Sequence, residues 1–141
     1  RPLLQSNFSV CASDDYLRRR GIPEHPQELH QHTLILTRRN PVWSFSGPGD
    51  EIVRLDGAAR LKVDELNIAA RAAENGLGIV NLPDYVVDKS LSAGRLQKLM
   101  PGWTPLPRPV YMLYPERKYI PGKVRLFIEY VMFKANENRF N

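Results

Sequence analysis

Two periods of hydrophobic and polar positions alternate along the chain, which predicts strands that alternate with helices. Short apolar runs or strict alternation predict strands at 10–12, 33–37, 59–63, 79–82, 96–99 and 110–114. Apolar stripes and capping residues predict helices at 14–20, a short helical turn from Pro26, 64–75, 84–91 and a last one from Pro121. Strands that alternate with helices are typical of an α/β fold, and we expect a mostly parallel sheet covered on both faces.

The pattern is clearest around the predicted helix 64–75. Asp64 is expected to cap this helix, Gly76 to end it in the left-handed conformation, and Gly78 to let the chain turn into the strand that stops at Pro83. Its narrow apolar stripe consists of Leu66, Ala69, Ala70, Ala73 and Leu77. Ser13 is likewise expected to cap the first helix, which carries acidic residues at its start and three arginines at its end.

Three other segments complete the predicted organisation. Trp43 and Phe45, a Gly-Pro-Gly-Asp connection and the strand 52–55 predict a hairpin. Three prolines within 105–109 make 102–109 an extended crossing rather than a core element. The last helix carries two apolar stripes, so more than half of its surface is expected to pack against other elements. One strand cannot bury that much of a helix. These stripes are Val124, Phe127, Ile128 and Val131, and Leu126, Tyr130 and Phe133.

Composition narrows the class of protein. The chain has 141 residues, of which 43% are hydrophobic and 25% charged, as in ordinary globular domains. It contains no apolar run of about 20 residues and no secretory signal, so we expect no membrane association and a cytoplasmic location. The single cysteine, Cys11, lies in an apolar run and is expected in the core.

Charge and side-chain chemistry argue against several functions. The net charge is +5, and most of the excess lies from Pro105 onward, where seven basic residues stand against three acidic ones. Because the excess is confined to this segment, a solvated surface is favoured over nucleic-acid binding by this chain. His25, His30 and His32 do not share a face and lack partners at a metal-ligand spacing, so no metal is expected. GLGIVN lacks the third glycine of a dinucleotide fingerprint, and no nucleophile elbow or P-loop occurs, so we expect neither a cofactor nor an enzyme.

Four motifs in order resemble the effector-binding domain of LysR-type transcriptional regulators. They are VCASDDYLRRRGIPEHPQEL, AENGLGIVNLPDYVV, AGRLQKLMPGW and YMLYPERKYIPGKVRLFIEYV. Together they extend over most of the chain, and Asp14 stands where the family usually has proline, another residue suited to a first helical turn.

The resemblance implies a two-lobed, periplasmic-binding-protein-like domain, with the second lobe complete and the first lobe partial. Residues 1–8 would end the first lobe and cross over, residues 9–106 would form the second lobe, and residues 107–141 would return to the first. A small effector would lie in the cleft between the lobes. It also implies a bacterial protein that is longer than this chain, with a DNA-binding winged helix-turn-helix, and a homodimer or homotetramer. In the family, the helix 64–75 takes part in the dimer contact, so Leu66, Ala70 and Ala73 are candidates for it.

The candidate effector residues follow the predicted strands. In open parallel sheets, ligands lie at the carboxyl ends of strands, where Pro83, Asp84 and Tyr85 begin a helix. The alternative is that Pro83 and Asp84 only start this helix and Tyr85 covers the core. Thr37 ends the predicted strand 33–37, and Arg38 and Arg39 follow it. A guanidinium there would pair with an organic acid; the alternative is that these are only solvated loop residues.

Asp64 and Ser13 are weaker candidates, because capping explains both. Asn7, with Ser13, flanks the first crossing between the lobes implied by the resemblance, where the family often places polar groups. A stand-alone solute-binding protein of the same fold and an enzyme of that fold are the rival interpretations.

Overall fold

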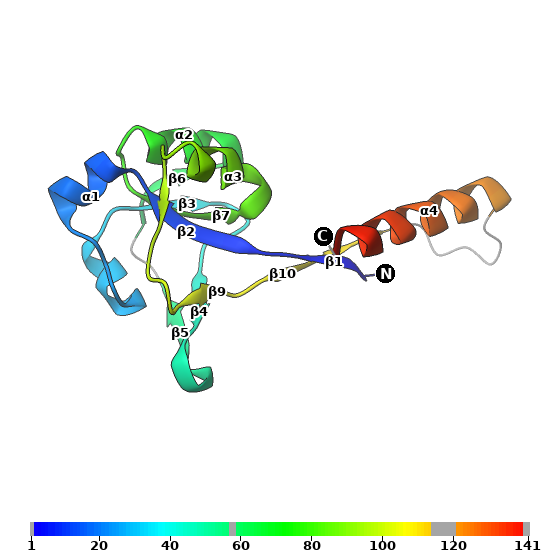
Figure 1. The fold of residues 1–141 in the computed structure, drawn as a ribbon, viewed down its shortest axis with the longest axis horizontal. Coiled ribbons are helices and arrows are strands. Elements are labelled where there is room, and N and C mark those ends of the chain that lie inside the picture. The colour runs from blue at the N-terminus through cyan, green and yellow to red at the C-terminus, as the bar shows by residue number, and fades with distance from the viewer. Residues whose placement is uncertain (1, 57–58, 114–120, 140–141) are drawn as a thin grey trace. The chain divides into compact units, whose positions relative to one another are not determined.

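The computed structural model describes residues 2–56, 59–113 and 121–139. The chain divides into two compact units (Figure 1). The larger unit is Asn7–Leu106, and the smaller unit combines Arg1–Ser6 with Pro107–Asn141. Each is considered by itself.

The larger unit contains a five-stranded sheet with the order β6-β3-β7-β2-β8. These strands are Ala59–Val63, Leu34–Thr37, Ile79–Pro83, Phe8–Ala12 and Gln97–Lys98. β3 is parallel to β6 and β7, whereas β2 is antiparallel to both of its neighbours, β7 and β8. Four strands thus run one way and β2 runs the other way. The expectation of α/β architecture is confirmed, but β2 makes the sheet mixed, because no strand-helix-strand crossover to a neighbouring strand fixes its direction.

Helices cover one face of this sheet (Figure 1). They are α2 (Leu66–Glu74) and α3 (Asp84–Ser92). The core on this side consists of Cys11, Ile35, Ala69, Ala70, Ala73, Val80, Leu82, Val87 and Leu96. The small alanine side chains of α2 let the helix approach the sheet closely.

The opposite face is covered by α1 (Asp14–Arg20), the 3₁₀ helix η1 (Pro26–Gln31) and a smaller sheet. That sheet has the order β5-β4-β9, with β5 at Ile52–Leu55, β4 at Trp43–Ser46 and β9 at Thr104–Pro105. The predicted hairpin is therefore confirmed, with the short 3₁₀ turn Pro48–Asp50 at its tip. Trp43, Phe45 and Leu55 contribute to the core between this sheet and the large one.

The crossing segment 102–109 is partly a core element, contrary to expectation. β9 pairs with β4, Pro105 is buried, and Trp103 packs against the core. Gly47 allows this packing, because a Cβ atom there would lie 2.3 Å from the indole ring of Trp103. Prolines are compatible with an edge strand, since an edge leaves some N–H positions unpaired in any case.

Helix capping was predicted correctly for α1 and wrongly for α2. The hydroxyl of Ser13 accepts the backbone N–H of Tyr16 at 3.2 Å. The N-cap of α2 is Glu65 instead of Asp64, and its side chain makes no capping hydrogen bond. The helix ends at Glu74, so Leu77 lies beyond it and is 55% exposed, outside the predicted stripe. Gly76 has a φ of 78°, the left-handed conformation expected of it.

A buried polar pair joins α1 to η1. The hydroxyl of Tyr16 accepts the backbone N–H of Thr33 at 3.1 Å, which leaves its proton for Nδ1 of His32 at 2.8 Å. Burial lowers the pKa of His32, the charge of Arg20 lowers it further, and Glu28 opposes them. The neutral imidazole is therefore the form that suits this position.

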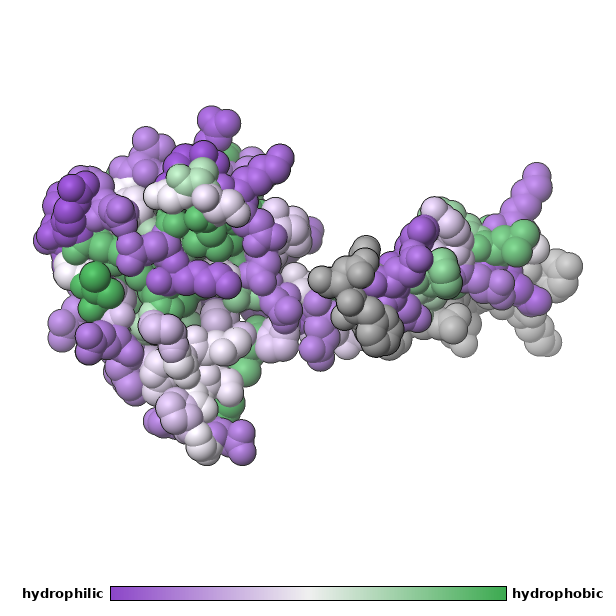
Figure 2. Space-filling model, viewed as in Figure 1, coloured by the Kyte–Doolittle hydropathy of each residue, from purple (hydrophilic) through white to green (hydrophobic). Residues whose placement is uncertain are grey.

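The smaller unit contains two paired strands and a long helix. β1 (Pro2–Ser6) is antiparallel to β10 (Arg108–Tyr111), so the predicted strand 110–114 begins two residues earlier, and Tyr114 lies outside the described residues. Helix α4 (Gly122–Arg139) contacts β1. Ile128 is buried, but most large apolar side chains of α4 are exposed, and Figure 2 shows them as green patches along the helix. None of the described helices is long and apolar enough to span a membrane.

Candidate functional site

The carboxyl ends of three strands of the larger unit lie along one edge of its sheet. β6, β3 and β7 run in the same direction, and Thr37 at the end of β3 is the register partner of Val63 at the end of β6. The edge therefore brings together Thr37, Asp64 and Pro83, with the residues that follow each of them. This is the part of an open α/β sheet where ligands bind.

Thr37 carries a buried hydroxyl at this edge. It is 4% exposed, and its hydroxyl oxygen has no hydrogen-bond partner among the described residues. Side chains alternate along a strand, so Thr37 lies on the same face as Ile35, which packs in the core beneath α2. A buried hydroxyl without a partner costs about 1–3 kcal/mol, a penalty that a ligand atom would remove.

Helix α2 begins shortly after the end of β6, the strand that pairs with β3. Val63, the partner of Thr37, is followed by only two residues before α2 begins at Leu66. The first N–H groups of a helix have no partner within the helix and carry partial positive charge. The side chain of the N-cap residue Glu65 makes no capping hydrogen bond to these groups. A helix N-terminus of this kind is where anions commonly bind.

The N-terminus of α3 is arranged differently. The carboxylate of Asp84 accepts the hydroxyl of Ser9 at 2.6 Å, and the backbone N–H of Asp84 donates to the carbonyl of Asn7 at 2.9 Å. Asp84 thus ties α3 to β2. Burial, and then the charge of Asp84, raise the pKa of the Cys11 thiol to about 12. Tyr85 is 74% exposed, which excludes the alternative that it covers the core.

Loop residues after β3 form a tight turn. The backbone N–H of Asn40 donates to the carbonyl of Thr37 at 3.0 Å, so Arg38 and Arg39 occupy the exposed middle of the turn. Asn40 itself is buried, and its side-chain amide donates to the carbonyl of Asn81 at 3.4 Å. The turn holds Arg38 at the same edge as Thr37.

Ser13 is not brought to this edge. It follows β2, which runs antiparallel to β7, so it lies at the end of the sheet opposite to Pro83. Its hydroxyl is used for capping. Asn7, at the start of β2, lies instead at the edge of Pro83, where its carbonyl contacts Asp84.

Asn81 is a buried residue at this edge that the sequence analysis did not single out. It is 6% exposed, and its side-chain oxygen has no hydrogen-bond partner within the described residues. It lies on the opposite face of the sheet from Thr37, because Ile79 two residues earlier belongs to the other core. A polar residue in the apolar run IVNL was the available signal.

The residues expected at a dimer contact are largely internal. Ala70 and Ala73 are buried in the chain's own core, and Leu66 is half-buried. The surface of α2 is formed by other residues, among them Asn67, Ile68 and Arg71. Among the residues that the structure describes, no three His, Cys, Asp or Glu side chains form a metal-binding group.

Comparison with known proteins identifies the family. The family model described as the LysR substrate binding domain matches residues 1–134. The chain belongs to this family. A curated relative, the uncharacterized HTH-type transcriptional regulator YhjC of Escherichia coli K12, is 30% identical over 138 residues, which are 93% of this chain and 45% of YhjC.

Solved structures agree with this assignment. Full-length AphB, a virulence activator of Vibrio cholerae, matches with a TM-score of 0.84 and 32% identity over 96% of this chain and 47% of AphB. The regulatory domain of AphB from Vibrio vulnificus matches with a TM-score of 0.82 and 31% identity over 95% of this chain and 66% of that domain. The fold is thus the periplasmic-binding-protein-like fold of LysR-type regulatory domains, and the chain spans about half the length of the full-length relatives. The relatives are transcriptional regulators, which does not favour a stand-alone solute-binding protein.

Proposed function

We propose that this chain is the ligand-sensing regulatory domain of a LysR-type transcriptional regulator. A small organic acid binds at the carboxyl edge of the large sheet and shifts the population of domain arrangements. The full protein acts in the cytoplasm without enzymatic activity, as a homodimer or homotetramer that binds DNA through a winged helix-turn-helix. Leu66, Ala70 and Ala73 belong to the helix at its dimer contact.

The buried, unpartnered hydroxyl of Thr37 is the observation that supports the effector site most strongly. A carboxylate at this edge accepts the Thr37 hydroxyl and the free N–H groups that start α2. The guanidinium of Arg38, in the adjacent turn, pairs with the second oxygen. This set of donors with a single positive charge favours a monoanion.

The remaining candidates shape the rest of the effector. Asp64 and Asp84 border the edge with acidic groups, which select an effector with a donor group away from its carboxylate. The exposed ring of Tyr85 offers a stacking surface beside Pro83. An aromatic or unsaturated acid fits these requirements better than a short aliphatic one.

A thermal-shift screen of aromatic and aliphatic carboxylates tests this proposal. A ligand at 100 times its dissociation constant stabilises the folded protein by about 2.7 kcal/mol. The best hit should lose its effect with Thr37→Val or Tyr85→Ala and keep it with Thr104→Val, an exposed threonine of the smaller sheet. Equal stabilisation of all these proteins contradicts the effector site. An export signal in the complete gene, in place of a winged helix, contradicts the assignment as a regulator.

A further inference from the structure

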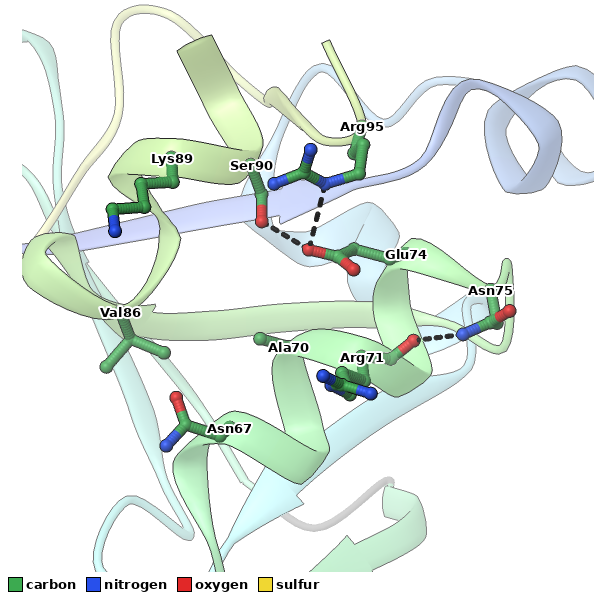
Figure 3. Close-up of a pocket in the computed structure, with 9 residues that line it drawn as sticks. All are labelled: Asn67, Ala70, Arg71, Glu74, Asn75, Val86, Lys89, Ser90 and Arg95. Atoms are coloured by element: carbon green, nitrogen blue, oxygen red, sulfur yellow. Dashed lines mark hydrogen bonds and ion pairs between the residues drawn. The ribbon is translucent and has the colours of Figure 1, made fainter. Parts of the chain in front are cut away.

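A groove runs between α2 and α3 on the outer side of the larger unit. It has a volume of about 660 Å³ and is lined by residues of both helices and by Arg95, which follows α3 (Figure 3). The contributing positions on α2 recur at helical spacing from Asn67 to Asn75, so one face of the helix forms one wall. A volume of this order is within the range of small-molecule sites.

The groove has an excess of positive charge. Arg71, Lys89 and Arg95 line it, against the single carboxylate of Glu74. Glu74 is already engaged, since it accepts the hydroxyl of Ser90 and lies 3.5 Å from Nε of Arg95. Neither Arg71 nor Lys89 forms an ion pair with any described residue. Two cations from different helices therefore line the groove without an ion pair to any described residue.

Contacts between side chains of the two helices hold the base of the groove together. Ser90 is 4% exposed, and its bond to Glu74 joins α3 to α2 at the position where Arg95 also binds (Figure 3). Arg71 comes from α2 and Lys89 from α3, so a ligand between them is contacted from both walls.

We propose that this groove is a second ligand site, distinct from the carboxyl edge, which takes a small dianion. Arg71 and Lys89 bind its two negative charges. The amides of Asn67 and Asn75 already donate to Glu65 and to the carbonyl of Arg71, and each has a second N–H for the ligand. A dicarboxylate and a phosphate share the required chemistry, namely two negative charges carried by oxygen acceptors. Binding joins α2 to α3 more firmly and thereby stabilises the larger unit.

Calorimetric titration with inorganic phosphate and with succinate tests this site, at ionic strength held constant with sodium chloride. We expect saturable binding of at least one of the two. Arg71→Gln and Lys89→Gln should each weaken it about ten-fold, the effect of losing one charge-assisted hydrogen bond. Lys62→Gln removes an exposed lysine of the same unit that does not line the groove, and should leave the dissociation constant unchanged. Circular dichroism verifies that each variant is folded.

Thr37→Val separates the two sites. If binding of these probes survives this substitution and responds to Arg71→Gln, the groove is their site. If Thr37→Val removes binding, the anion lies at the start of α2 and the groove proposal is wrong. An unsaturable response, equal effects of Lys62→Gln and Lys89→Gln, or binding of a polyglutamate peptide but of neither small anion also overturns it.

Discussion

Replacing Thr37 with valine should stabilise the protein that lacks a ligand. The hydroxyl of Thr37 is buried and has no partner within the described structure, so water is lost on folding without a compensating hydrogen bond. Valine places a methyl group where the hydroxyl was, with nearly the same volume. The unfavourable desolvation disappears, and no cavity forms.

The magnitude follows from the cost of an unsatisfied hydroxyl. Protein mutational data place this cost at about 1–3 kcal/mol, so we expect the free energy of unfolding to rise by at least about 1 kcal/mol. Ser9→Ala provides the matched control, because Ser9 is as buried a residue as Thr37 but its hydroxyl does have a partner, the carboxylate of Asp84. Its loss should lower the free energy of unfolding by about 1.5–3 kcal/mol.

Urea denaturation followed by circular dichroism measures both effects. The slope of free energy against urea should not change, so that the midpoints report stability directly. A decrease of 1 kcal/mol or more with Thr37→Val would refute the reasoning, because it would mean that the hydroxyl makes a hydrogen bond in the folded protein. With an effector present, the sign should reverse, since the valine variant gains no stabilisation from the ligand.

Three further predictions concern other parts of the larger unit. Because the pKa of His32 is lowered in the folded protein, the unfolded chain binds this proton more tightly. The free energy of unfolding should therefore fall as the pH decreases from about 6.5 towards the pKa of the folded state. In His32→Gln, the free energy of unfolding measured from pH 8 to 5 should depend less steeply on pH. Cys11 is buried and its pKa is raised to about 12, so a thiol reagent at pH 8 should modify it only as fast as the protein opens, and rapid labelling would place the thiol at the surface. Gly47→Ala should destabilise by about 1–3 kcal/mol through its clash with Trp103 and shift the tryptophan fluorescence, whereas Gly102→Ala, with open space around its Cβ, should do neither.

Local patterns predicted most elements because each depends on neighbours in the sequence. The buried strand 79–83 and the Ser13 cap have all their signals within a few residues. The direction of β2 was not predictable in this way, since it depends on which strands it joins after the chain has turned. Asp64 and Glu65 are both acceptable near the start of a helix, and the turn after β6 decides which one becomes the N-cap.

The sequence predicted only that the candidate site lies at the carboxyl ends of the strands. Strand ends indicated Thr37 and Pro83, but the missing partner of the Thr37 hydroxyl is a property of the packed structure. The groove between α2 and α3 had no signal, because Arg71, Lys89 and Arg95 are spread over the sequence and only packing brings them together. Ser13 was a candidate because it flanks the crossing implied by the resemblance, and the antiparallel direction of β2, which the sequence did not reveal, places it at the opposite end of the sheet from Pro83.

The chain leaves and re-enters the smaller unit at neighbouring positions. The larger unit begins directly after Ser6 and ends at Leu106. Ser6 is the register partner of Arg108, so the two ends of the larger unit lie close together. An insertion whose two ends adjoin can be exchanged for another without disturbing its host. Evolution can therefore replace the larger unit as a whole between these strands, and an engineer can transplant residues 7–106 as one cassette into another protein of this fold.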